Sequence, residues 1–366
     1  MKAVILVGGE ATRLRPLTCN IPKAMVPVLN TPFLEHVIRH LGRHQIRDIV
    51  LAEGPLAGPI KSYFGDGSQL GVRLNYVAED TPLGTAGAIK NAEKYLDETF
   101  LVLNGDIFPD LDITAMVGFH RERKAKATIT LTLVDDPTSY GVINTDAWGR
   151  IRQFLEKPTW SEVTTNMINA GTYTLEPDIL TKIPPQTKVS IERETFPLLL
   201  EEGEPVYAYH SSAYWLDTGT PEKYLQLHRD LLSGKCKQYP LPLGKEVLIG
   251  EQCNIHPTVQ IKGHVVIGPN CSIGRQVKLT GPVVIGSGCQ IMPGAIVEES
   301  VIWRNTHIGQ HVSLTGSIVA DHCCLNADSV CEDSVLGDNV TVGGGVKLKP
   351  GSLIWPGTMV GEAIDL

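Results

Sequence analysis

A six-residue repeat runs through the last third of the sequence and restricts its fold more than any other feature. Aliphatic residues recur at every sixth position, at Ile249, Ile255, Ile261, Ile267, Ile273, Leu279, Ile285, Ile291 and Val297. A small or β-branched residue precedes all but the first of these by two positions: Cys253, Val259, Val265, Cys271, Val277, Val283, Cys289 and Ala295. This pattern is typical of a parallel β-helix of hexapeptide repeats. The phase slips after Val297. The period then resumes with Val330, Leu336, Val342, Leu348 and Ile354.

Three cysteines follow the same period. Cys253, Cys271 and Cys289 are eighteen residues apart, so we expect them to stack along one edge of the β-helix, one in each coil. Burial as small core residues is favoured over a metal column. The eight cysteines form no CxxC pair, which indicates reduced thiols and predicts neither a zinc site nor a redox motif.

The first half of the chain alternates strands with helices, which predicts a mostly parallel sheet covered on both faces. The expected strands are 3–7, 48–52, 72–77 and 100–103. One helix is expected to follow Thr31 as its N-cap and Pro32 as its first residue, and a second to run from 84 to 95. Antiparallel strands are expected at 128–133, 141–144, 151–155 and 171–175, followed by helices at 191–201 and 222–232. Residues 235–242 are expected to link a domain of residues 1–235 to a β-helix domain of residues 243–366.

The charge balance narrows the classes of partner. The net charge is −8, which argues against nucleic acid and against an anionic membrane surface. The first apolar run is too short for a signal peptide, and no run has the length of a membrane span. We therefore expect a cytoplasmic protein that binds any anionic ligand through local cations.

Such cations follow the first strand. Gly8 and Gly9 allow a tight turn that exposes backbone N–H groups, and Arg13, Arg15 and Lys23 follow closely. Amides with guanidinium and ammonium groups form a cradle for a polyphosphate. The loop has neither the P-loop pattern nor the dinucleotide-binding pattern.

Other polar residues come at the carboxyl ends of strands. Glu79, the pair Gly84 and Thr85, and Asp106 each follow an expected strand, as Gly8 and Gly9 do. Ligands of open α/β sheets bind beyond these ends, so the sequence predicts one shared site there.

These segments resemble the signatures of one family. The run Gly8-Gly9-Glu10-Ala11-Thr12-Arg13-Leu14-Arg15-Pro16-Leu17-Thr18 and the pair Pro22-Lys23 are similar to the nucleotide-sugar pyrophosphorylases, the sugar-1-phosphate nucleotidyltransferases. Further matches follow in family order at residues 103–106, 156–158, 169–171 and 215–219, so the resemblance covers about residues 1–235. The family usually has Gly where this chain has Ala11, which costs backbone freedom in the loop. The hexapeptide region resembles the left-handed β-helix family.

The resemblance implies a Rossmann-like, mixed and mostly parallel nucleotidyltransferase domain followed by a left-handed parallel β-helix. It implies transfer of a nucleotidyl group from a nucleoside triphosphate to a sugar 1-phosphate, with release of pyrophosphate. The implied catalytic residues are Arg13, Lys23 and Lys157. The implied nucleotide-binding residues are Leu6, Gly8, Gly9, Thr12, Glu79, Gly84, Thr85 and Asn104. The implied sugar-binding residues are Tyr140, Gly141, Glu156, Asn169 and Gly171. Asp106 and Asp217 match the family's metal aspartates and would hold Mg²⁺.

The base and the sugar are inferred from a shorter stretch. A carboxylate at Glu79 can accept the two adjacent N–H donors of guanine as a fork. The segments 82–87 and 190–197 resemble GDP-mannose pyrophosphorylases, which favours GTP and mannose 1-phosphate. Two alternatives stay open: a thymidylyl- or uridylyltransferase acting on glucose 1-phosphate, and a catalytically silent regulatory subunit that senses nucleotide sugars. The β-helix also predicts a homo-oligomer.

Overall fold

The structure is a computed structural model that describes residues 1–366 except 10, 55–57, 80, 109, 238–245 and 362–366. The chain divides into two compact units. The first contains Met1–Gly9 and Leu34–Asp217, and the second contains Glu10–Phe33 and Thr218–Leu366. The expected linker at 235–242 lies largely outside the described residues. The segments 10–33 and 218–234 group with the β-helix rather than with the sheet that they flank in sequence.

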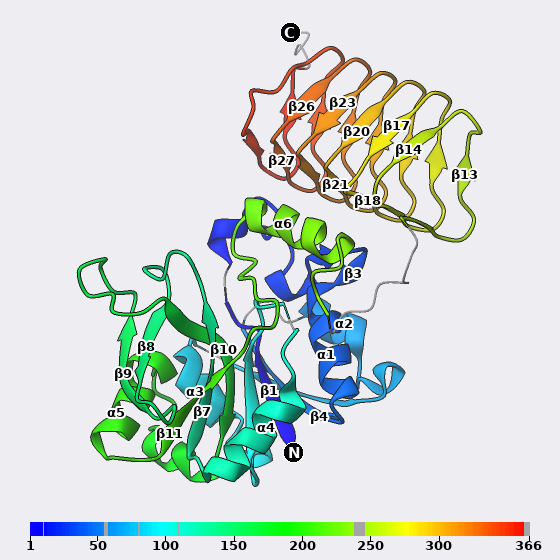
Figure 1. The fold of residues 1–366 in the computed structure, drawn as a ribbon. Coiled ribbons are helices and arrows are strands. Elements are labelled where there is room, and N and C mark those ends of the chain that lie inside the picture. The colour runs from blue at the N-terminus through cyan, green and yellow to red at the C-terminus, as the bar shows by residue number, and fades with distance from the viewer. Residues whose placement is uncertain (10, 55–57, 80, 109, 238–245, 362–366) are drawn as a thin grey trace. The chain divides into compact units, whose positions relative to one another are not determined.

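The first unit is built on a nine-stranded sheet (Figure 1). Its parallel half contains β1 (Lys2–Leu6), β4 (Asp48–Glu53), β5 (Arg73–Ala78) and β6 (Phe100–Asn104). Strand β1 lies between β4 and β6 and pairs with both in parallel. Its central residues Ala3, Val4 and Ile5 are fully buried, as the uninterrupted apolar run predicts for a strand covered on both faces. The expected parallel sheet is confirmed.

The other half of the sheet is mostly antiparallel, also as expected. It contains β7 (Ala127–Leu133), β10 (Met167–Leu175) and β11 (Val206–His210), with a hairpin of β8 (Gly141–Thr145) and β9 (Ile151–Glu156) joined to β10. Strand β10 is antiparallel to both β6 and β7, whereas β11 is parallel to β7. The pairing of β10 with β7 is interrupted between Asn169 and Tyr173, which creates a bulge in the middle of β10.

The α-helices in the described residues are α1 (Phe33–Arg43), α2 (Gly58–Phe64), α3 (Gly84–Asn91), α4 (Ile113–Arg123), α5 (Phe196–Glu201) and α6 (Pro221–Leu232). Two expectations need correction. Thr31 and Pro32 do not begin α1 but form β3, which pairs with β2 (Pro27–Val28), because the Phe33 amide donates to the Val26 carbonyl and closes this hairpin first. The segment 191–201 is not one helix, because a π-turn at Ile191–Thr195 precedes α5.

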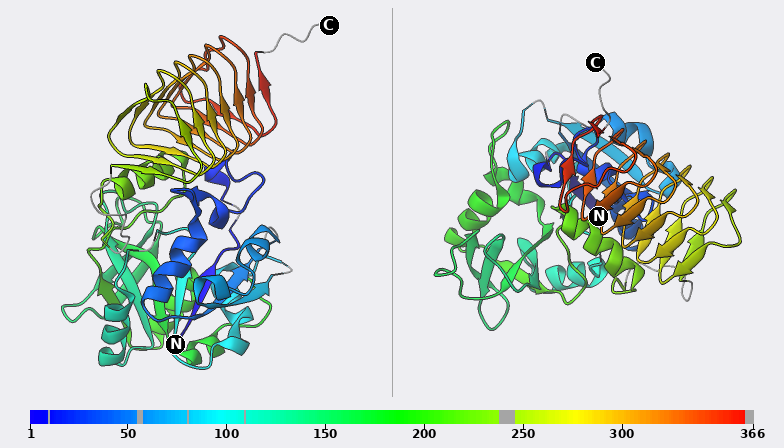
Figure 2. Two further views of the ribbon diagram at one scale, coloured as in Figure 1. Left: turned by 90° about the vertical axis from the view of Figure 1, so that its right-hand side faces the viewer. Right: turned by 90° about the horizontal axis from the view of Figure 1, so that it is seen from above.

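The second unit contains the predicted β-helix, whose short strands form three parallel sheets along its length (Figure 2). The first sheet contains β12 (Val247–Ile249), β15 (Val265–Ile267), β18 (Val283–Ile285), β21 (Val301–Ile302), β24 (Ile318–Val319), β27 (Val335–Leu336) and β29 (Leu353–Ile354). The second contains β13 (Asn254–Ile255), β16 (Ser272–Ile273), β19 (Gln290–Ile291), β22 (His307–Ile308), β25 (Cys324–Leu325), β28 (Thr341–Val342) and β30 (Met359–Val360). The third contains β14 (Gln260–Lys262), β17 (Lys278–Thr280), β20 (Ile296–Glu298), β23 (Ser313–Thr315) and β26 (Val330–Glu332).

Shorter coils explain the slip in the repeat. Lys278 pairs with Ile296, eighteen residues on, but Gln290 pairs with His307, seventeen residues on. Seventeen-residue spacings continue to Cys324 with Thr341, and eighteen returns at Val335 with Leu353. After these shorter coils, the inward position is Cys331, which is fully buried. The prediction that Val330 occupies this position, where the six-residue period resumes, was therefore wrong. Cys271 and Cys289 are buried in the core, with Cys253 packed against it, as their spacing predicts.

Helix α6 and the segment around β2 are hydrogen-bonded to the β-helix within the second unit. The indole Nε1 of Trp303 donates to the Tyr224 hydroxyl at 3.0 Å, and that hydroxyl donates to the Pro27 carbonyl. The Asn30 side chain donates to the Ile285 carbonyl at 2.8 Å. The chain that follows the first glycine loop is thus anchored to the β-helix.

Among the described helices, none is long and apolar enough to cross a membrane.

Candidate active site

The site is built at the carboxyl ends of β1 and β6 in the first unit. Leu6 and Asn104, the last residues of these strands, are register partners. The amide of Gly105 donates to the Leu6 carbonyl at 3.0 Å, so the pairing continues past the strands. Asp106 therefore follows directly on the strand end beside the first glycine loop. Sequence reasoning placed Leu6, Gly8, Gly9, Asn104 and Asp106 here, and the structure puts them on these two neighbouring strand ends.

A short antiparallel contact brings the two candidate metal ligands together. Ile107 forms a β-bridge with Asp217, and the Phe108 amide donates to the Leu216 carbonyl at 3.4 Å. A further bond joins the same two segments, from the Tyr214 amide to the Asp110 carboxylate at 3.1 Å. Asp106 and Asp217 thus lie on adjacent backbones although they are far apart in the sequence.

The donor set fits a hard divalent cation that keeps water and substrate oxygens as further ligands. Asp106 and Asp217 are predicted to supply two carboxylates, and Mg²⁺ usually takes one or two from a protein when it also binds phosphates. Within the described residues, no group of three or more His, Cys, Asp and Glu side chains forms a complete protein cage. The nucleotidyltransferases that the sequence resembles generally use divalent metal ions. A site open to phosphate oxygens is consistent with these observations.

The expected sugar-binding residues on β8 and β9 are cross-strand neighbours. Gly141 is the register partner of Glu156, and the Lys157 amide donates to the Tyr140 carbonyl at 3.0 Å. Burial raises the pKa of Glu156 most, and the nearby Glu192 carboxylate raises it further. The Tyr140 ring packs edge-on against Trp215, with ring centroids 5.3 Å apart.

The bulge of β10 brings the other sugar-binding candidates next to the loop that contains Asp106. The Asn169 side chain accepts from the Gly171 amide at 2.9 Å, and Trp215 donates to the Ala170 carbonyl at 3.1 Å. Gly171 has a φ of +70°, and a Cβ there would lie 2.3 Å from Cδ1 of Ile107 and 2.7 Å from Nδ2 of Asn104. The contact with the Asp106 loop therefore requires glycine at this position.

The nucleotide-binding candidates around the start of α3 make contacts within the fold that the sequence did not reveal. The Glu79 carboxylate accepts from the Leu83 amide at 2.8 Å, which fixes it at the start of α3, and burial raises its pKa. A Cβ on Gly84 would lie 2.6 Å from the Val189 carbonyl oxygen, so this glycine admits a neighbouring segment. The Thr85 hydroxyl donates to Glu192 at 2.7 Å and accepts from the Ile191 amide at 2.8 Å.

The remaining candidates belong to the second unit. Thr12 and Arg13 lie in a 3₁₀ turn at Thr12–Leu14, and Lys23 begins another at Lys23–Met25. Ala11 precedes the first turn in the left-handed region, at φ 46° and ψ 41°. Its carbonyl accepts from the Thr18 hydroxyl at 2.9 Å. The roles of Thr12, Arg13 and Lys23 in the site stay predictions.

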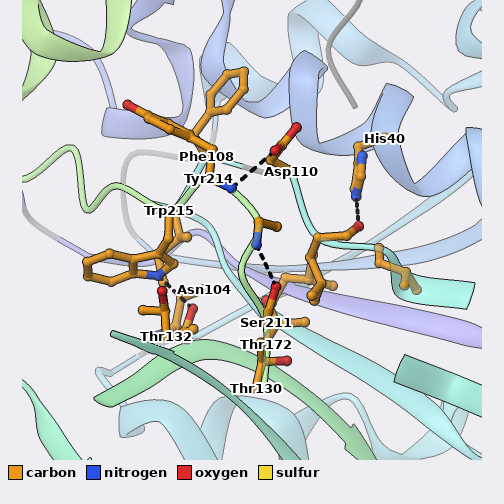
Figure 3. Close-up of a pocket in the computed structure, with 16 residues that line it drawn as sticks. His40, Asn104, Phe108, Asp110, Thr130, Thr132, Thr172, Ser211, Tyr214 and Trp215 are labelled. Carbon is orange, nitrogen blue, oxygen red and sulfur yellow. Dashed lines mark hydrogen bonds between the residues drawn. The ribbon is translucent and has the colours of Figure 1, made fainter. Parts of the chain in front are cut away.

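A small cavity is lined by residues at and after the end of β6, among them Asn104 and Phe108, and by residues of β7 and β10 (Figure 3). Its volume of about 30 Å³ is enough for one or two water molecules. The lining surface is mostly apolar, and four hydroxyl-bearing side chains also contribute to it: Thr130, Thr132, Thr172 and Ser211. The buried Oδ1 of Asn104 borders it and has no hydrogen-bond partner among the described residues. The role of Asn104 in nucleotide binding stays a prediction.

Three side chains of this region were not among the predicted site residues. Trp215 stands two residues before Asp217, inside a motif that the sequence already singled out. Glu192 also lies in a stretch that carried the resemblance, but a charged residue in a polar turn is usually solvated. Tyr173 gave no signal, because an aromatic residue in a buried strand reads as core.

Comparison with known proteins agrees with this architecture. The nucleotidyl transferase family matches residues 2–234. The chain belongs to this family. Bacterial transferase hexapeptide repeats match residues 246–281, and the left-handed β-helix domain of the EIF2B epsilon subunit matches residues 275–366.

Individual members of the nucleotidyl transferase family resemble the chain over most of its length. A mannose-1-phosphate guanyltransferase of Eremothecium gossypii is 41% identical over 94% of this chain and 95% of its own. A UTP–glucose-1-phosphate uridylyltransferase of Synechocystis is 36% identical over 91% of this chain and 90% of its own. Among solved structures, a putative glucose-1-phosphate thymidylyltransferase of Bacillus anthracis has a TM-score of 0.57 and 27% identity, covering 67% of this chain and 98% of that one.

Proposed function

We propose that the protein is a mannose-1-phosphate guanylyltransferase, which makes GDP-mannose and pyrophosphate from GTP and mannose 1-phosphate. A phosphate oxygen of mannose 1-phosphate attacks the α-phosphorus of GTP, and the bond from that phosphorus to the bridging oxygen of the β-phosphate breaks. The observation that supports the proposal is the backbone bridge between Ile107 and Asp217, which brings the segments that carry Asp106 and Asp217 next to each other. Likeness to a guanyltransferase over nearly the whole chain favours this reaction.

The roles of individual residues follow from the charge that each must meet. Arg13 and Lys23 would neutralise the β- and γ-phosphates and so stabilise the leaving pyrophosphate. Lys157, held beside Tyr140 at the end of β9, would bind the phosphate of the sugar substrate. Asp106 and Asp217 would hold Mg²⁺, which when bound neutralises phosphate charge. Catalysis is then mainly positioning and charge neutralisation.

The sugar would bind against β8, β9 and the bulge of β10. Glu156 would accept hydrogen bonds from sugar hydroxyls, beside Gly141, where a Cβ would lie 2.8 Å from its Oε2. Asn169 and Gly171 would complete the pocket, with the Trp215 and Tyr140 rings beside them. Glu79 would read the N1–H and N2–H groups of guanine.

The test is pyrophosphate release with Mg²⁺ across GTP, ATP, UTP and dTTP, each with mannose 1-phosphate and with glucose 1-phosphate. Turnover with GTP and mannose 1-phosphate above all other pairs is the expected result. Preference for UTP or dTTP with glucose 1-phosphate would keep the mechanism and overturn the assignment of the base. Binding of a nucleotide sugar without turnover of any pair would make the chain a regulatory subunit.

We further propose that the protein is a homo-oligomer joined through its β-helix. The last coil exposes large apolar side chains, with Leu353 54%, Trp355 53% and Met359 60% exposed. Light scattering should therefore give a mass above that of one chain, and Trp355→Lys should lower it. A monomeric wild type would contradict this proposal.

A further inference from the structure

A connected set of hydrogen bonds joins the two halves of the candidate site through one carboxylate. Oε2 of Glu192 accepts from the Thr85 hydroxyl at 2.7 Å and from the Ser190 hydroxyl at 2.8 Å. Oε1 of Glu192 accepts from the Tyr173 hydroxyl at 3.3 Å. Thr85 begins α3 on the nucleotide side, whereas Tyr173 lies on β10 directly after the bulge. One half-buried side chain therefore contacts both sides.

The chain of contacts continues into the sugar-binding bulge. The Asn169 amide donates to the Tyr173 hydroxyl at 2.7 Å, and the other end of the same side chain accepts from the Gly171 amide at 2.9 Å. The Tyr173 ring is fully buried and packs against Phe196, with centroids 5.1 Å apart. The position of Asn169 is thus fixed by a hydroxyl group that Glu192 orients.

Hydrogen bonds also fix the start of α3, on the nucleotide side of the site. The Ile191 amide donates to the Thr85 hydroxyl, and the amides of Ala86 and Gly87 donate to the Val189 carbonyl at 3.0 and 3.3 Å. Glu192 itself lies in a π-turn, a rare geometry that is frequent at functional sites. The start of α3 is therefore joined by several hydrogen bonds to the segment that carries Glu192.

We propose that Glu192 is a positioning residue that couples the nucleotide-binding start of α3, through Thr85, to the sugar-binding bulge of β10, through Tyr173 and Asn169. Glu192 acts through these residues, so loss of its charge loosens both substrate pockets at once. Its carboxylate also lies near Glu156, whose pKa it raises, so it affects the group proposed to bind sugar hydroxyls. The inference rests on the proposed function, because that function makes the two sides one site.

The test asks whether a substitution on one side of Glu192 changes the KM of the substrate that binds on the other side. Thr85→Val alters the nucleotide side and should raise the KM of the sugar 1-phosphate about tenfold. Tyr173→Phe keeps the packed ring but removes the hydroxyl, and should raise the KM of the nucleoside triphosphate as well as that of the sugar. Glu192→Gln should raise both KM values by about 10- to 100-fold, the range for hydrogen bonds to a charged group. Combining Glu192→Gln with Tyr173→Phe should add little, because both remove the same connection.

Glu194→Gln is the matched control. Glu194 lies in the same turn and is exposed, and it accepts only from the backbone amide of Ser190, at 2.9 Å, with no hydrogen bond to Thr85, Tyr173 or Asn169 among the described residues. This variant should keep both KM values. Thermal melting of each variant distinguishes local loosening from unfolding, and Tyr173→Phe keeps the inference testable if Glu192→Gln does not fold.

The wild-type enzyme is assayed first, with whichever pair of substrates it turns over. No turnover of any pair is a failure of the proposed function, and the variants are then compared by calorimetric binding of GDP-mannose, which Glu192→Gln should weaken. Wild-type KM values, or wild-type binding, in a folded Glu192→Gln would overturn the inference. KM effects confined to the altered side of Thr85→Val and Tyr173→Phe would overturn it too.

Discussion

Gly171 offers the sharpest test of how the sheet supports the site. At φ +70° an alanine costs about 1–2 kcal/mol in backbone strain. Its Cβ would also lie 2.3 Å from Ile107 Cδ1 and 2.7 Å from Asn104 Nδ2, which adds about 1–3 kcal/mol for overpacking. Gly171→Ala should therefore lower the free energy of unfolding by about 2–5 kcal/mol. The displaced neighbours adjoin Asp106, so kcat should fall at least tenfold, since a shift of about 1 Å in a site can cost about 100-fold.

Two variants separate the contributions. Gly203→Ala is the matched control, because Gly203 has φ +74° but no neighbour within 4 Å of a Cβ, so only the backbone cost remains. Ile107→Val removes the nearest clashing atom and should restore part of the stability and turnover of Gly171→Ala. Urea denaturation and pyrophosphate release measure the two effects. If Gly171→Ala loses no more stability than Gly203→Ala and keeps its kcat, the bulge does not support the loop that contains Asp106.

Three further changes test other parts of the structure. Ala11→Gly should raise the free energy of unfolding by about 1 kcal/mol, because Ala11 lies at φ 46°; an unchanged urea midpoint would contradict the strain. Burial raises the pKa of Glu53 to about 7, so the folded state binds its proton more tightly than the unfolded state. The free energy of unfolding should therefore fall as pH rises from about 4.5 to 7. At pH 8, Glu53→Gln should be more stable than the wild type by up to about 3 kcal/mol, whereas Glu201→Gln on the surface should match the wild type. Equal pH profiles for Glu53→Gln and the wild type would contradict this prediction. Tyr224→Phe leaves the buried indole N–H of Trp303 without its acceptor, which should cost about 1–3 kcal/mol in chemical denaturation, and no loss would show that this contact does not stabilise the second unit.

Regular patterns in the sequence predicted most of the fold. The apolar run at β1 gave a buried parallel strand, and the six-residue period gave the β-helix. Prediction failed where a local contact competed with propensity. Thr31 and Pro32 look like a helix start, but the bond from the Phe33 amide to Val26 closes a hairpin there. Val330 continues an ideal period, but seventeen-residue coils bring Cys331 inside, and only stacking against neighbouring coils determines coil length.

The same limit applies to the site. The rule that ligands bind beyond the ends of parallel strands predicted a site at Gly8, Gly9 and Asp106, and these residues follow the neighbouring strands β1 and β6. Asn104, Glu156 and Asp217 were predicted from the family resemblance, and their roles stay predictions. Motifs did not reveal that the Thr85 hydroxyl is held by Glu192, or that Tyr173 orients Asn169. The first contact joins residues 107 positions apart in the sequence, and the second depends on a tyrosine that looks like ordinary core, so local patterns carry no information about either contact.

The central claim is that Asp106 and Asp217 mark the place where the nucleotidyl group is transferred. Its most direct test is the rate of pyrophosphate release from GTP and mannose 1-phosphate with Mg²⁺, compared between the wild type, Asp106→Asn and the exposed control Asp135→Asn. The account predicts rapid release by the wild type and the control, and a loss of at least 100-fold in Asp106→Asn with unchanged thermal melting, since stabilising transition-state charge typically contributes about 100- to 1,000-fold. Release by Asp106→Asn at the wild-type rate would contradict it.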